Sequence, residues 1–414
     1  MKKLFVVALA LFFVAGLVAT GYAEDRLSLS GAYRVRAWAK ENYSDFSDND
    51  DADDQAYWDQ RFRVAGKFQI AEGVSSHFRF DIGEAKWGLN TTTKRGWNRP
   101  THDNEMFHID RAYGRWEQDL WILNAGLAYT SFGNQIAVDQ NQFGFILRLK
   151  LPVQIDGVYS KIDESGDTRD DGEWDDIDFY GGQATYKADN WSVGLFAAAI
   201  NDQTDTDDSP WVIGVNGSWS YGMFALKGEL DQFGGDIGKN DVIGTQIYVD
   251  LKANVLPNAS VGVEGFWANS TDSADETQVT GLTDSDSFVP SDRLSGFHGA
   301  IIPLSGIASV TGGSSKRIQE FDPSGENAGS VGFQLYGNYR FLEKWLVQAG
   351  YMYLKPQDDD ITELDDVNVL NAALIWDCLP NTTARVGYNY TGPNFDGIDS
   401  DRAQAVVGML QLSW

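Results

Sequence analysis

The 414-residue sequence holds a single cysteine, Cys378, and only four histidines, which are His77, His102, His108 and His298. A lone cysteine cannot form the disulfide framework of a small extracellular module. No two histidines stand at helical metal-ligand spacing, and the chain lacks a Gly-x-Ser-x-Gly motif and a phosphate-binding glycine loop. We therefore expect no enzyme activity, no metal site and no cofactor.

Basic residues are also scarce, since 32 Lys and Arg stand against 60 Asp and Glu, and the formal net charge is −28. Such a balance repels nucleic acid and anionic lipid surfaces, so we exclude nucleic acid as a partner. Glycine and aromatic residues are plentiful, with 43 glycines and 13% aromatics. This composition fits strands joined by tight turns better than a helical protein.

Long hydrophobic runs are missing everywhere except at the N-terminus. Lys2 and Lys3 precede an apolar stretch, Leu4 to Thr20, and Gly21-Tyr22-Ala23 supplies the small residues that a signal peptidase recognises. We expect residues 1–23 to be a signal peptide and 24–414 the mature chain. A membrane anchor is the alternative, but acids follow the run and no positive stop-transfer flank does. A secreted chain without a helical anchor is either soluble or a β-barrel.

The last stretch of the chain, Asp401 to Trp414, alternates strictly. One row comprises Gln404, Val406, Gly408, Leu410, Leu412 and Trp414. A row of this kind that ends on an aromatic residue resembles the closing strand of bacterial outer-membrane β-barrels. The resemblance implies that Leu410, Leu412 and Trp414 form the signal that the barrel-assembly machinery recognises. The alternative is the last strand of a soluble sheet.

The same alternation recurs upstream, where minimal turns and long polar connections follow one another regularly. The short turns fall near Glu72, Gln118, Pro152, Asp189, Tyr221, Pro257, Glu343 and Pro380. We predict eighteen strands, at 27–39, 58–70, 74–84, 106–117, 120–130, 143–151, 153–162, 177–188, 190–200, 210–220, 223–233, 241–253, 258–268, 330–341, 344–355, 366–378, 381–391 and 401–414. An even number of strands with short turns on one side is typical of bacterial outer-membrane barrels.

Two strands break the alternation and leave the strand number open at sixteen or twenty. In Phe107 to Trp116, Arg111 and Arg115 share a row with Ile109 and Tyr113, so a bulge changes the face or the arginines lie at the rim. The segment from Val367 to Asp377 changes phase near Leu370. The predicted fold is an all-β, transmembrane, antiparallel up-and-down barrel in the outer membrane of a Gram-negative bacterium. At sixteen to eighteen strands, side chains cannot fill the interior, so an aqueous channel is expected.

Residues Ala125 to Lys161 contain the pattern Gly-x-x-x-x-x-Phe-Gly, from Gly126 to Gly133. The stretch resembles the third-loop region of the bacterial porin family, in which such a strand precedes a loop that folds inward and narrows the channel. The resemblance implies a constriction loop at 131–142 and a homotrimer. In that family the loop carries acids, whereas here Asp139 is its only acid, beside neutral groups such as Asn141.

A basic wall faces the predicted lumen by parity. It comprises Arg34, Arg36, Arg61, Arg63 and Arg79, with Arg148 and Lys150 lower down and the acids Asp81, Asp110 and Asp156 on the same half. A charge in a lipid-facing position costs roughly 2–4 kcal/mol at the midplane, so these groups should face water. Clustered cations raise the local anion concentration, so we expect an anion preference. The alternative is that the charges only keep the channel hydrated.

The connection at 269–329 is far longer than an ordinary loop. Within it, Gly296 to Ser315 has no charged side chain and six large apolar ones. Such an island must be buried, either in the lumen, which we favour, or against a neighbouring subunit. The other long connections, such as Asp45 to Asp54 and Asp163 to Asp176, are acidic and are interpreted as solvated loops facing lipopolysaccharide.

These patterns predict a porin for passive diffusion of small hydrophilic solutes and ions. A substrate-specific channel is the alternative within transport. Its mark would be an aromatic track, and the inward aromatics are scattered: Trp38, Phe196, Tyr248, Phe266 and Tyr336. From another class, the chain could be a structural or adhesive surface barrel, or the sheath of a larger outer-membrane complex.

Overall fold

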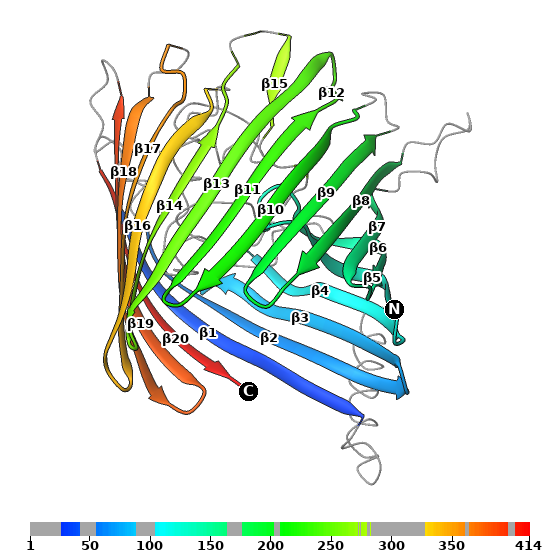
Figure 1. The fold of residues 1–414 in the computed structure, drawn as a ribbon. Helices are drawn as coiled ribbons and strands as arrows, with labels where there is room; N and C mark the ends of the chain where they lie inside the picture. The colour runs from blue at the N-terminus through cyan, green and yellow to red at the C-terminus, as the bar shows by residue number, and fades with distance from the viewer. Residues whose placement is uncertain are drawn as a thin grey trace.

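The computed structural model describes residues 26–41, 55–87, 104–163, 176–202, 208–271, 273, 275–279, 282, 328–360, 364–395 and 402–414. The expected signal peptide at 1–23 and the apolar island at 296–315 lie outside these residues. None of the described residues belongs to a helix long and apolar enough to cross a membrane. The described chain is built of β-strands, and Figure 1 shows them as oblique arrows around a central space.

Eighteen strands form the wall. The first ten are β1 (Leu27–Glu41), β2 (Gln55–Ala71), β3 (Val74–Lys86), β4 (Asn104–Glu117), β5 (Trp121–Ser131), β6 (Asp139–Leu149), β7 (Val153–Asp163), β8 (Ile177–Lys187), β9 (Trp191–Asp202) and β10 (Trp211–Tyr221). The other eight are β11 (Phe224–Gly234), β13 (Asn240–Leu256), β14 (Ala259–Ala268), β16 (Ser330–Leu342), β17 (Trp345–Lys355), β18 (Leu364–Leu379), β19 (Thr382–Phe395) and β20 (Ala403–Ser413). Two short strands, β12 (Asp236–Ile237) and β15 (Glu276–Gln278), pair with β13.

The wall closes between its last and first strands. Each wall strand pairs antiparallel with the next one along the chain, and β20 pairs with β1 through Leu410 opposite Val35. The backbones of Gly31 and Trp414 exchange two hydrogen bonds, of 3.0 and 3.1 Å, at the end of this seam. The Trp414 ring lies over Gly31, where a Cβ would collide with it. The predicted eighteen-stranded barrel is therefore confirmed.

The short turns lie where the sequence predicts them. All eight connect neighbouring strands by two or three residues and share one end of the barrel. Three of them contain a left-handed residue, namely Gly73 (φ 68°) between β2 and β3, Gly222 (φ 58°) between β10 and β11, and Asn381 (φ 59°) between β18 and β19. Glycine and asparagine adopt this conformation at low cost, so the sequence favours these turns locally.

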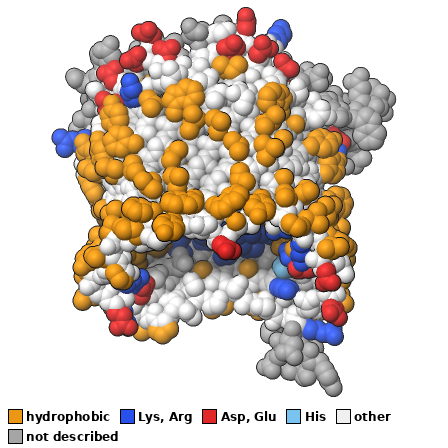
Figure 2. All heavy atoms as spheres, viewed as in Figure 1, with side chains coloured by type: hydrophobic (Ala, Val, Ile, Leu, Met, Phe, Trp, Pro, Cys, Tyr) orange, Lys and Arg blue, Asp and Glu red, His pale blue; other side chains and the backbone are white. Residues whose placement is uncertain are grey.

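The two faces of the wall differ in polarity. Outward rows are apolar and exposed, as with Leu195 (59%), Ile213 (50%) and Val386 (58%). The space-filling view in Figure 2 shows hydrophobic side chains over the outer surface, acids along the upper edge, and Lys and Arg lining the hollow in the lower half. The apolar rows do not pack between two stacked sheets, so a soluble sandwich is excluded.

The structure resolves both irregular strands. In β4 the register with β3 shifts between Arg79 and Phe80, which is a bulge that turns Arg111 and Arg115 to the inner face. The predicted phase change in β18 is wrong, because the register with β19 is regular from Asp366 to Asp377. Val367 and Val369 face inward and are buried in an apolar cluster. The prediction placed apolar residues on the outer face, so these two inward valines suggested a phase change.

Candidate functional site

The β5–β6 hairpin leaves the wall and enters the barrel. Pairing of β5 with β4 ends at Leu127, and pairing of β6 with β7 ends at Phe143, although β5 and β6 continue to pair with each other. The irregular tip covers residues 132–138, which is shorter than the predicted loop at 131–142, because Ser131 and 139–142 extend the two strands. Ile136, Ala137 and Val138 at the tip are completely buried.

Hydrogen bonds hold the tip against the inner wall. The Gly133 N–H donates to the Gln183 side chain on β8 over 2.7 Å, and the Asn134 N–H donates to the Glu229 carboxylate on β11. The Asn134 amide also donates to the Gly228 carbonyl over 3.0 Å. Gly133 has φ 57°, and any Cβ there would collide with the Glu229 carboxylate. Glycine at 133 is thus required by both backbone conformation and space.

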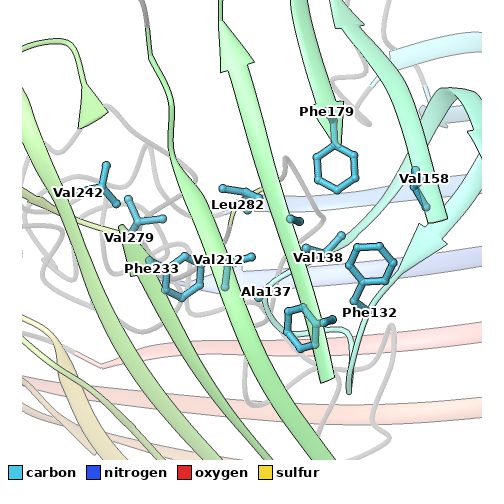
Figure 3. Close-up of a cluster of buried hydrophobic side chains, with 12 residues drawn as sticks. Phe132, Ala137, Val138, Val158, Phe179, Val212, Phe233, Val242, Val279 and Leu282 are labelled. Atoms are coloured by element: carbon cyan, nitrogen blue, oxygen red, sulfur yellow. The ribbon is translucent and has the colours of Figure 1, made fainter. Parts of the chain in front are cut away.

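Apolar contacts seat the same hairpin, as the close-up in Figure 3 shows. Phe132 packs against Phe196, with ring centroids 5.9 Å apart. The long connection takes part too, because Leu282 lies in the cluster and its N–H donates to the Ala137 carbonyl over 2.9 Å. The cluster comprises Phe132, Ala137, Val138, Val158, Phe179, Phe196, Ala198, Val212, Phe233, Val242, Val279 and Leu282.

Ile136 extends the contact toward the following strands. It belongs to a second buried cluster with inward side chains of β13, β14 and β17–β20. Tyr248 (5% exposed) and Phe266 (3%) lie in this cluster, and Phe196 lies in the first. Three of the predicted inward aromatics therefore pack around the hairpin and do not line a track for a solute.

The predicted arginines gather on β1–β3 with carboxylates beside them. Arg36 binds Asp59 over 2.8 Å, and Arg63 binds Asp81 through two hydrogen bonds of 2.6 and 2.5 Å. Arg34 and Arg61 stand directly opposite each other in the β1–β2 register. Arg79 pairs with Asp110, the bulge residue of β4. Arg111, which the sequence left undecided, stacks 4.8 Å over the Tyr129 ring.

On this basic wall Arg36, Arg63 and Arg79 are more exposed than their carboxylate partners, whereas at the short-turn end Glu117 (43%) is more exposed than Arg115 (27%). Side-chain exposure is 28% for Arg63 against 5% for Asp81, and 22% for Arg79 against 10% for Asp110. Among the described inner side chains of β1–β4, eight cations face four carboxylates, so the surplus is 8 − 4 = +4. The cations are Arg34, Arg36, Arg61, Arg63, Lys67, Arg79, Arg111 and Arg115, and the acids are Asp59, Asp81, Asp110 and Glu117. A cavity of about 250 Å³ opens against Lys67, Arg79 and Arg111.

The remaining predicted residues occupy other places. Arg148 binds Asp156 over 2.7 Å on β6–β7, and Lys150 binds Glu117 over 2.8 Å at the short-turn end. Asn141 donates to Asp110 over 3.1 Å. Asp139 is the first residue of β6 and accepts a hydrogen bond from Tyr129. The irregular tip itself therefore carries no acid.

Sequence reasoning missed an acidic wall on β11–β14. Its inner side chains include Glu229, Asp231, Asp250 and Glu264, of which Asp231 and Glu264 are fully buried. The Gln246 amide donates to Asp231 over 2.8 Å, and the Tyr336 hydroxyl donates to Asp250 over 2.8 Å. The alternation along β11 could have indicated that Glu229 and Asp231 face inward, since they alternate with exposed Leu226 and Leu230. No local pattern, however, links them to a hairpin about 95 residues away.

No protein-family model matches the chain, and no curated protein does. Solved structures match over nearly its whole length. OccAB2 from Acinetobacter baumannii is 11% identical, with 95% of this chain and 99% of that chain covered and a TM-score of 0.57. The outer membrane protein opdK from Pseudomonas aeruginosa is 13% identical, with 94% and 99% covered and a TM-score of 0.54. A BenF-like porin from Pseudomonas fluorescens Pf-5 is 12% identical, with 95% and 100% covered and a TM-score of 0.55.

These likenesses, the closed wall and its apolar outer face give the chain the fold of an outer-membrane porin. The barrel belongs in an outer membrane, as predicted, because only a closed barrel satisfies all strand hydrogen bonds within lipid. The signal peptide, the homotrimer and recognition by the barrel-assembly machinery stay predictions.

Proposed function

We propose that the barrel is a passive diffusion channel for small hydrophilic solutes and ions, and that it prefers anions. The observation that carries this proposal is the surplus of +4 on the described inner face of β1–β4, where the guanidinium groups of Arg36, Arg63 and Arg79 are more exposed than their carboxylate partners. An anion moving along this wall is attracted by the guanidinium groups. The same groups repel a cation of similar size.

The seated hairpin makes this wall important for permeation. Its tip packs against inner side chains of β7–β11, β13, β14 and β17–β20, so we propose that the solute passes along β1–β4. One unit charge at 4 Å contributes roughly 1 kcal/mol in bulk water and about 4 kcal/mol at an effective dielectric constant of 20. Since 1.4 kcal/mol is about a tenfold ratio, a small surplus suffices for measurable selectivity.

A substrate-specific channel for small anions is the second candidate. Two features favour it over an unselective pore, namely a tip held by hydrogen bonds as well as apolar contacts, and the contact of Leu282 with Ala137. Among similar structures, opdK from Pseudomonas aeruginosa has been determined with vanillate, an organic anion. Liposome swelling with a series of neutral sugars and organic anions of matched size separates the two candidates, because only a specific channel discriminates strongly within the anions.

The anion preference is tested by reversal potentials in planar bilayers under a KCl gradient. The variant Arg34→Gln/Arg61→Gln lowers the surplus by two and should shift the reversal potential toward cation selectivity. The matched control Arg63→Gln/Asp81→Asn removes a complete ion pair without changing the net charge, so it should shift the potential much less. Cation selectivity of the unmodified barrel, or equal shifts in both variants, would contradict the proposal.

A further inference from the structure

The outer face of the barrel carries a polar pocket where most of its surface is apolar. A cavity of about 450 Å³ lies at the loop end of β18–β20, the orange and red strands of Figure 1. Its lining includes Asp366, Asn368, Tyr390, Gly392, Asn394 and Arg402. These residues share the outward row with exposed Leu370 and Val386, so the pocket opens away from the lumen.

Local contacts give this pocket a defined shape. Gly392 presents no side chain, and the Tyr390 ring folds over it, since a Cβ at Gly392 would stand 3.1 Å from the Tyr390 hydroxyl. The Tyr351 hydroxyl on β17 donates to the Asn368 side chain on β18 over 2.6 Å, and the Asn368 amide donates to Asp366 over 2.8 Å. The amide, carboxylate and phenol groups are thereby held around the space left by Gly392.

The pocket lies at the upper border of the apolar surface and between two cations. Leu370 (48% exposed), Tyr388 (39%) and Val386 (58%) precede it along β18 and β19 toward the membrane centre. Arg402 opens β20 on one side, and exposed Lys355 ends β17 on the other. Since neighbouring strands are about 4.8 Å apart, the three intervals from β17 to β20 span roughly 14 Å.

We propose that this pocket binds the phosphorylated sugar headgroup of lipopolysaccharide in the outer leaflet. The apolar row below it contacts the acyl chains, Tyr390, Asn368 and Asn394 contact the sugar, and Arg402 and Lys355 contact phosphate. A headgroup that combines sugar, phosphate and acyl chains fits this order of surfaces better than a glycerophospholipid, which offers no sugar to the amide and phenol groups. The inference goes beyond the channel function and needs only the membrane placement of the barrel.

Binding is measured on the full-length barrel in detergent by native mass spectrometry, with titration of purified lipopolysaccharide. Two variants test the pocket: Arg402→Gln/Lys355→Gln removes the cations, and Gly392→Leu fills the space at Gly392. The matched control Lys187→Gln/Lys239→Gln removes the same charge from exposed lysines outside the pocket. We expect both pocket variants to bind about tenfold more weakly and the control to bind like the unmodified protein.

Channel conductance in bilayers, which should be unchanged in every variant, shows that the barrels are folded and separates this test from the proposed function. Competition with inorganic phosphate and with phosphatidylglycerol vesicles identifies the source of the recognised group. Equal affinity of pocket variants and control, or full displacement by either competitor, overturns the assignment to lipopolysaccharide.

Discussion

The basic wall on β1–β4 and the acidic wall on β11–β14 share the same alternation of inward and outward side chains, yet their charged groups differ in exposure to water. On the basic wall, the arginines of the ion pairs keep 17–29% of their side chains exposed to water, as with Arg63 at 28%. On the acidic wall, Glu229 is 4% exposed, and Asp231 and Glu264 are fully buried. The difference arises because the β5–β6 hairpin is hydrogen-bonded to the acidic side.

This comparison shows that a count of inner charges does not predict the field in a channel. Charges that an inward segment covers serve as hydrogen-bond partners, whereas uncovered charges act on the solute. Glu229 illustrates the first use, because its carboxylate accepts the Asn134 N–H at the hairpin tip. Arg34 and Arg61, which stand opposite each other in register on the basic wall, are only partly buried and illustrate the second.

The largest effect is expected from charge reversal on the basic wall. Arg34→Glu/Arg61→Glu changes the surplus by four units, from +4 to 0, so the anion preference should disappear. Reversal potentials in a KCl gradient measure it. Charge reversal at Lys187 and Lys239, two exposed lysines outside both walls, changes the net charge by the same four units and should move the reversal potential less; an equal shift would mean that the basic wall has no special influence.

Release of the hairpin from the acidic wall should have the next largest effect. Glu229→Ala removes the acceptor of the Asn134 N–H, a hydrogen bond worth about 0.5–1.5 kcal/mol, so the tip should detach from the wall more often. Single-channel recordings should show higher conductance or frequent steps to a wider state. Glu229→Gln keeps an acceptor for the Asn134 N–H and serves as the control, with an intermediate effect.

Gly133→Ala disturbs the same contact from the hairpin side, because its Cβ would collide with the Glu229 carboxylate and a φ of 57° disfavours alanine. It should produce the same conductance steps as Glu229→Ala, although the Glu229 carboxylate stays in place. If neither variant changes the recordings, the hairpin does not limit the current.

Local patterns predicted most of the wall, and non-local contacts account for what they missed. Period-two rows and turn residues such as Gly73 and Asn381 act within a few positions, so strand number and turns follow from sequence. The β4 bulge was one of two stated alternatives. The bond between Asn134 and Glu229 joins residues 95 positions apart, so no local pattern could reveal it. The same absence of long-range information turned the buried Val367 and Val369 into an apparent phase change.

A smaller effect is expected from neutralising an acid that the comparison assigns to the covered wall. Glu264→Gln alters a fully buried carboxyl group, so the reversal potential should change little. Lys227→Gln removes a charge from an exposed lysine on β11 and should move the reversal potential further. A larger shift in Glu264→Gln would mean that this acid reaches the permeating ion.

Salt should weaken the same anion preference without any substitution. The Debye length falls from about 10 Å at 0.1 M to about 3 Å at 1 M, so uncovered charges lose most of their influence on a passing ion. The anion preference of the unmodified barrel should therefore decline over this range, when reversal potentials are measured at a constant concentration ratio. Arg34→Glu/Arg61→Glu, with no surplus left on its basic wall, should depend on salt much less. A preference that persists unchanged at 1 M would instead indicate direct contact between the anion and the guanidinium groups, which screening does not remove.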